Sequence, residues 1–234
     1  MALVDLSAWQ FFFGGGHQAL KGTAHYTEPE MMTFAESLDL LLHLAADRTR
    51  EPEIQNQIRR RLKEDPVAKQ WQKQRTKLKS QPHFTVYRET PHYEAYHEAA
   101  RAMASGTHTL KQRNMVDGLN AEIGASNTVA SVGQIVFHGR ADFDLHSSPT
   151  YPSFISTSLD PTVSIYHAIK RSKKNDARPV VYMLTLTDSL HAIWGNSGRS
   201  LEEWELLLQS GLACSNIQTY SGAIFDVIAA TIGP

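Results

Sequence analysis

The order of hydrophobic patterns along the chain most constrains its fold. In the first part, apolar residues recur at helical spacing, in residues 31–44, 93–104 and 110–123. Later, short runs rich in β-branched and aromatic residues replace them, at 134–138, 153–158, 180–186, 206–208 and 224–232. One helical pattern, residues 161–170, stands among these strands. Helices first and strands later predict an α+β fold.

Composition narrows the class of protein further. The 234 residues are 41% hydrophobic, which is enough apolar material for a packed core. The single cysteine, Cys214, excludes a disulfide framework and a zinc or iron–sulfur site built on several thiolates. No apolar run approaches the roughly 18 residues of a membrane span, and the start lacks the basic residues of a secretory signal. We therefore expect no membrane partner and a cytoplasmic location, in the producing cell or in a target cell after delivery.

The net charge of −1 conceals an asymmetry. Residues 59–79 hold nine Lys or Arg against two acids, a balance of +7, so the remainder of the chain carries −8. Helices are expected over residues 53–63 and 67–79, ending before Pro82. This basic segment has three interpretations that the sequence leaves open: a solvated helix face, contacts with RNA or DNA phosphates, or attraction to an acidic protein.

Three short motifs follow one another in the strand-rich half. The first, His138-Gly139-Arg140, ends a predicted strand, and its two cationic residue types share one face because side chains alternate along a strand. Eighteen residues after His138 comes Ser156, and Glu205 follows forty-nine residues later. The complete second and third motifs are Ser156-Thr157-Ser158 and Glu203-Trp204-Glu205. Each motif alone is more often structural than functional, so their joint order carries the argument.

In this order and spacing the motifs resemble those of the mono-ADP-ribosyltransferase toxins and ecto-enzymes, in the class named Arg–Ser–Glu. The resemblance covers roughly residues 110–234 and includes a polar, glycine-containing loop at 192–200 before the glutamates. The first motif departs from the class: His138 stands where its arginine is usual, as in the poly-ADP-ribose polymerase and diphtheria-toxin branch. The resemblance implies a split β-sandwich catalytic domain, residues 83–234, after a helical N-terminal region, residues 1–82. It also implies NAD as substrate and no metal.

The resemblance implies a role for each motif residue. Glu205 would stabilise the positive charge that develops on the ribose as nicotinamide leaves, and Glu203 would act as general base. Within the family a glutamate at the position of Glu203 accompanies arginine as the acceptor. The NAD-binding residues would be His138, Gly139, Arg140, Ser156, Thr157 and Ser158, with either His138 or Arg140 as the key residue of the first motif.

The resulting hypothesis is transfer of ADP-ribose from NAD to a macromolecule, with arginine on a protein as the expected acceptor. RNA or DNA as acceptor, NAD hydrolysis and a catalytically silent binding protein remain as alternatives. Proteins of this family and size are typically toxins or effectors, so an immunity, antitoxin or chaperone partner is also expected.

Overall fold

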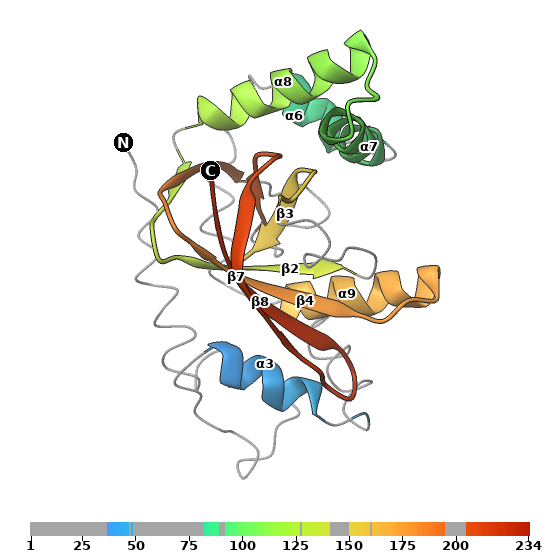
Figure 1. Ribbon diagram of the computed structural model, residues 1–234, viewed down its shortest axis with the longest axis vertical. Helices are drawn as coiled ribbons and strands as arrows, with labels where there is room; N and C mark the ends of the chain where they lie inside the picture. The colour runs from blue at the N-terminus through green and yellow to red at the C-terminus, as the bar shows by residue number, and fades with distance from the viewer. Residues whose placement is uncertain are drawn as a thin grey trace.

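The computed structural model describes residues 37–46, 48, 82–88, 92–126, 128–140, 150–159, 161–194 and 205–234 (Figure 1). Within the described residues, every element before residue 125 is a helix, and all the strands begin at residue 128 or later. The helices are α3 (Ser37–Ala45), α6 (Pro82–Tyr87), α7 (His92–Ala104), α8 (Leu110–Gly124) and α9 (Pro161–Asn175). The strands are β1 (Thr128–Ala130), β2 (Ile135–Arg140), β3 (Ile155–Ser158), β4 (Val180–Leu186), β5 (Leu190–Trp194), β6 (Glu205–Leu208), β7 (Ala213–Tyr220) and β8 (Asp226–Gly233).

The eight strands form one connected sheet in the order β1-β5-β6-β3-β2-β4-β8-β7. All neighbouring strands are antiparallel except β4 and β8, which are parallel. The join between β3 and β2 is the narrowest, with the single residue pair Phe137 and Ser158, whereas β2 pairs with β4 over six residues. The sheet therefore consists of two halves, β1-β5-β6-β3 and β2-β4-β8-β7, that meet at one point.

The two halves pack face to face. One hydrophobic cluster takes side chains from both, among them Ile155 and Leu208 from the first half and Tyr182 and Ile228 from the second. Because side chains alternate along each strand, the residues between them point to the outer faces. Leu207 and Val181 lie in two other clusters for this reason. The α+β class and the split sandwich expected from the sequence are thus both present.

Helices cover the two outer faces, as Figure 1 shows. Helices α6, α7 and α8 pack on the first half through a cluster that contains Phe84, Leu119 and Leu207. Helices α9 and α3 cover the second half through a cluster that contains Ile165 and Val227. A capping box at Thr109 and Gln112 fixes the start of α8, since each side chain bonds the backbone of the other residue.

Helix α3 is the described part of the helix expected from residue 31 onward. It packs on β8, and the carbonyl of Ala45 accepts hydrogen bonds from the backbone N–H groups of Ala223 (2.7 Å) and Ile224 (3.0 Å). These bonds satisfy one of the carbonyls that the end of a helix leaves without an intrahelical partner. This stretch of the N-terminal region therefore shares a core with the strand-rich half, while the boundary expected at residue 82 stays a prediction.

Several expected elements have different limits. Helix α9 runs to Asn175 and not to Lys170, and it ends where Asp176 takes a left-handed conformation with φ +50°. Strands β1, β5 and β7 and helix α6 were not expected from the sequence. The basic segment and the helices expected at 53–63 and 67–79 lie outside the described residues. Within the described ranges, no helix has the length and apolar character to cross a membrane.

Candidate functional site

Strands β3 and β6 bring Ser156 and Glu205 together. The register pairs Ser158 with Glu205 and Ser156 with Leu207, so Ser156 and Glu205 are diagonal neighbours on one face of the sheet. The Ser156 hydroxyl donates a hydrogen bond to the Glu205 carboxylate. Two residues forty-nine positions apart are thereby held by strand pairing, which fixes their backbones before any ligand binds.

The other two residues of the serine motif face structural partners. The Thr157 hydroxyl donates to the Leu206 carbonyl at 2.7 Å and is buried with it. Ser158 is also buried and lies at the pair with Phe137 that joins the two halves of the sheet. These contacts hold β3 against its neighbours.

The first motif reaches the second through a buried chain of hydrogen bonds. His138 Nδ1 lies 2.7 Å from the Ser156 carbonyl, and this acceptor requires the ring proton to be on Nδ1. His138 Nε2 then accepts from the Tyr151 hydroxyl at 3.0 Å, and Arg140 Nη1 donates to the same hydroxyl oxygen at 2.7 Å. Arg140, Tyr151 and His138 are all less than 10% exposed. The chain therefore fixes both residues of the first motif beside Ser156.

Burial and the neighbouring Arg140 guanidinium lower the pKa of His138 to about 3. The histidine is therefore neutral at pH 7, and Arg140 is the cation of the motif. The hydrogen-bond pattern agrees, because each ring nitrogen has a partner that suits the neutral ring.

This lowered pKa predicts a pH dependence of stability. Between about pH 3 and 6.5 the unfolded chain binds a proton at His138 that the folded chain does not, so stability falls as pH falls through this range. We expect a slope of up to about 1.4 kcal/mol per pH unit from this residue. Urea unfolding of the wild type and His138→Asn at pH 7.5, 6.0 and 5.0 measures it. Equal slopes in the two proteins would contradict the assignment.

Other side chains at the site carry no signal in the sequence. The Tyr87 hydroxyl oxygen lies 3.3 Å from His97 Nε2, and His97 Nδ1 lies 2.5 Å from the Ser153 hydroxyl oxygen. Burial raises the pKa of Tyr87 well above its usual value, and the Glu205 carboxylate raises it further. Arg171 acts on the same groups, since its charge lowers the pKa of both Tyr87 and His138.

Gly139 has a packing requirement of its own. A Cβ at this position would lie 1.9 Å from the Ser164 carbonyl oxygen and 2.9 Å from the Ala168 nitrogen, both in the backbone of α9. Absence of a side chain therefore lets α9 lie directly on β2 between His138 and Arg140. The expected binding of NAD by Gly139 stays a prediction.

The remaining predicted site residue, Glu203, and the loop at 195–200 lie outside the described residues. Across the described part of the chain, no three His, Cys, Asp or Glu side chains gather where a metal ion could bind. The structure thus brings together one or more side chains from each of the three motifs: His138 and Arg140, Ser156, and Glu205.

No protein-family model matches the sequence, and a search of curated proteins finds no match. Solved structures with a similar arrangement include the ADP-ribosyltransferase Vis in complex with an inhibitor, at 15% identity and a TM-score of 0.49, covering 85% of this chain and 91% of that one. Vis comes from Vibrio splendidus. C3stau2 from S. aureus, solved with NAD, has 14% identity and a TM-score of 0.47, covering 80% and 96%. Likeness of fold does not specify a reaction, so the side chains at the site carry the functional argument.

Proposed function

We propose that this protein is a mono-ADP-ribosyltransferase that transfers ADP-ribose from NAD to a macromolecule and releases nicotinamide. The observation that carries the proposal is the hydrogen bond from Ser156 to Glu205, with the Arg140–Tyr151–His138 chain ending on the carbonyl of the same serine. Three motifs from distant parts of the sequence thus meet in one place. A carboxylate, a hydroxyl that orients it and a buried cation suit the cleavage of a glycosidic bond in a substrate that carries a pyrophosphate.

Glu205 supports the bond-breaking step. As the bond from ribose to nicotinamide breaks, positive charge develops on the ribose, and a fixed carboxylate stabilises that charge. Ser156 holds one oxygen of the carboxylate, so the other oxygen is directed without loss of side-chain freedom on binding. Nicotinamide leaves as a neutral amide, and the acceptor atom forms the new bond to the ribose carbon.

Arg140 supplies the positive charge for the substrate. Its guanidinium is held by Tyr151, and guanidinium groups bind phosphate or ribose oxygens through several donors at once. His138 is neutral at pH 7, so its part is to orient Tyr151 and the Ser156 backbone. We therefore assign the key position of the first motif to Arg140.

Arginine on a protein is the proposed acceptor, and Glu203 is the residue that supports it. Glu203 lies two positions before Glu205, where a carboxylate can take a proton from an incoming nucleophile. We include in the proposal a toxin or effector role, with action in a cytoplasm.

Incubation with NAD labelled in the adenylate part and a cell lysate tests the proposal. Label is expected in protein, in a form that is released by hydroxylamine under conditions that cleave arginine linkages. Label in RNA or DNA, or only in free ADP-ribose, would replace the acceptor by nucleic acid or water. If folded protein yields none of these products, the enzymatic proposal is wrong.

Replacement of the orienting serine is expected to slow turnover without preventing NAD binding. Ser156→Ala removes the hydrogen bond to Glu205, and we expect kcat to fall about tenfold to a hundredfold with little change in KM. Steady-state nicotinamide release measures both constants. A raised KM with unchanged kcat would show that Ser156 binds substrate and does not orient the carboxylate.

The two glutamates are expected to separate transfer from hydrolysis. Glu203→Gln should remove transfer to protein, because the acceptor keeps its proton, while NAD hydrolysis by water continues. Parallel measurement of protein labelling and of nicotinamide release distinguishes the two steps. Equal loss of both would show that Glu203 serves bond cleavage itself.

A further inference from the structure

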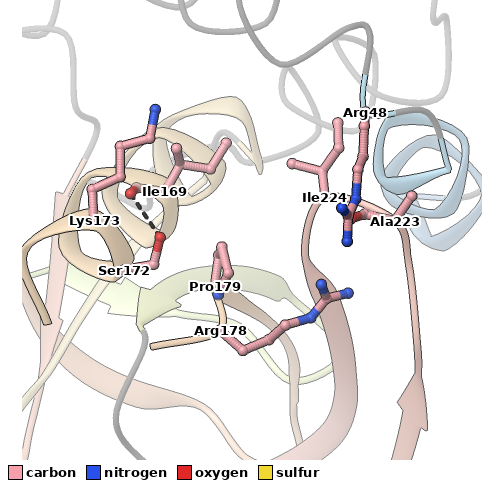
Figure 2. A pocket seen from close by; sticks show the side chains of 8 residues that line it. All are labelled: Arg48, Ile169, Ser172, Lys173, Arg178, Pro179, Ala223 and Ile224. Atoms are coloured by element: carbon pink, nitrogen blue, oxygen red, sulfur yellow. Dashed lines mark hydrogen bonds between the residues drawn. The ribbon is translucent and has the colours of Figure 1, made fainter. Parts of the chain in front are cut away.

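A cavity lies apart from the candidate site. It has a volume of about 260 Å³ and lies among the end of α3, the last turns of α9, the start of β4 and the turn between β7 and β8 (Figure 2). None of its eight lining residues belongs to the three motifs. They are Arg48, Ile169, Ser172, Lys173, Arg178, Pro179, Ala223 and Ile224.

The lining residues include three cations and no acid. Figure 2 shows the side chains of Arg48 and Arg178 on the side of the β7–β8 turn and Lys173 on the side of α9. Beside the cavity, the carboxylate of Asp226 forms an ion pair with Arg178 at 2.9 Å. The lining residues thus carry three positive charges, and Asp226 adds one negative charge beside Arg178, a balance that favours an anion.

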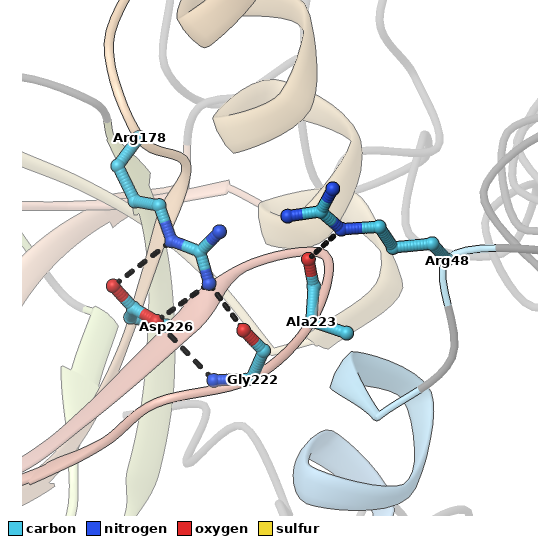
Figure 3. Close-up of polar contacts among 5 residues, drawn as sticks. All are labelled: Arg48, Arg178, Gly222, Ala223 and Asp226. Atoms are coloured by element: carbon cyan, nitrogen blue, oxygen red, sulfur yellow. Dashed lines mark hydrogen bonds and ion pairs between the residues drawn. The ribbon is translucent and has the colours of Figure 1, made fainter.

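The two guanidinium groups are held in place by neighbouring carbonyls of one turn, as Figure 3 shows. Arg48 Nε donates to the Ala223 carbonyl at 2.9 Å, and Arg178 Nη2 donates to the Gly222 carbonyl. Both oxygens of Asp226 accept from Arg178, at 2.9 and 3.1 Å, and one of them also accepts from the Gly222 N–H at 3.2 Å. The turn therefore orients the two arginines before a ligand arrives.

Several donors of these groups remain for a ligand. Within the described residues, Nη1 and Nη2 of Arg48 and Nη1 of Arg178 have no protein hydrogen-bond partner. A guanidinium offers five N–H donors in a planar arrangement that matches the oxygens of a phosphate. Lys173 lines the cavity on the side of α9 and adds a third positive charge.

We propose that this cavity binds the phosphate group of a small phosphorylated ligand. The cavity, at about 260 Å³, has room for a phosphate or pyrophosphate with a small substituent. It is smaller than the pockets that enclose drug-sized molecules, which begin near about 300 Å³. A doubly charged phosphate gains from each of the three cations, whereas a single carboxylate can pair fully with only one guanidinium. The bound group would link α3, α9 and the β7–β8 turn.

Calorimetric titration tests the proposal, with inorganic phosphate and pyrophosphate as probes and acetate as the monovalent comparison at constant ionic strength. We expect saturable binding of one phosphate or pyrophosphate per chain and none of acetate. Arg48→Gln and Lys173→Gln should each weaken binding about tenfold. Thermal unfolding without ligand confirms that each variant is folded, and having two variants keeps the test valid if one is unstable.

Lys174→Gln is the matched control, because this exposed lysine is next to Lys173 on α9 and does not line the cavity. It should bind phosphate as the wild type does. Equal weakening in Lys174→Gln would show a general effect of net charge, and no saturable binding by the wild type would overturn the proposal. So would loss of binding in Arg140→Gln with normal binding in Lys173→Gln, because the phosphate would then occupy the candidate active site.

Discussion

Glu205→Gln is expected to reduce nicotinamide release from NAD by about a thousandfold while the protein stays folded. The amide keeps the shape of the side chain and can still accept a hydrogen bond from Ser156, so the β3–β6 pairing is unaffected. It cannot supply the negative charge that stabilises the ribose cation. Single-turnover assays with excess enzyme measure the chemical step, and circular dichroism confirms the fold.

The expected signature is a change in kcat with binding retained. NAD affinity, measured by calorimetry or by tryptophan fluorescence, should change less than tenfold in Glu205→Gln, since the carboxylate acts on charge that develops only in the transition state. Glu98→Gln is the control: Glu98 is exposed on α7 and outside the hydrogen bonds of the site. Wild-type turnover by Glu205→Gln would contradict the role of Glu205 and, with it, the proposed reaction.

Loss of the same carboxylate has a second expected effect, on Tyr87. The charge of Glu205 raises the pKa of this buried phenol, after burial itself. Removal of the charge brings the pKa of Tyr87 downward, although burial keeps it above the usual value. Tyr87 of α6 is hydrogen-bonded to His97 of α7, so both helices contact a group whose pKa depends on Glu205.

The motif residues could be predicted because the order and spacing of the three motifs resemble those of a known family, and because local patterns placed each motif on a strand. Ser156 and Glu205 lie on adjacent strands, and each strand is marked by a short apolar or β-branched run that the sequence displays. His138 and Arg140 have a common direction through the alternation of side chains in β2. Local patterns were thus sufficient to place them on suitable elements.

Tyr151 could not be predicted from such patterns. It lies outside the named strands, next to the isolated bridge between Thr150 and Ala213, and its position depends on backbone bonds to Leu212 and Gly211. Its part in the site depends on tertiary contacts with His138 and Arg140. Tyr87, His97 and Arg171 reach the site from helices whose packing the sequence does not specify.

The strands that were missed share a physical reason. Strand β7 lies at the edge of the sheet, so five of its eight residues are exposed, and no hydrophobic alternation marks it. The last three residues of β5 fall within the polar loop expected at 192–200, and β1 has only three residues. These strands are stabilised by pairing with neighbouring strands, and the sequence of a strand does not show which strands lie beside it.

Gly139→Ala is expected to destabilise the protein by about 3 kcal/mol or to prevent folding. The new methyl group would meet the Ser164 carbonyl oxygen at 1.9 Å, and that oxygen belongs to the backbone of α9, so no rotamer change can relieve the contact. Helix α9 would have to move away from β2, and with it the cluster that contains Phe137 and Ile165 would open. Urea unfolding followed by circular dichroism measures the change.

Gly124→Ala is the matched control for this substitution. Gly124 is the last residue of α8, has an ordinary backbone conformation, and nothing lies within 4 Å of an added Cβ. Alanine there should leave stability unchanged or raise it by up to about 1 kcal/mol, because it restricts the unfolded chain. If Gly139→Ala were equally stable, α9 could not lie on β2 as described. The geometry of His138 and Arg140, on either side of that contact, would then need to be redetermined.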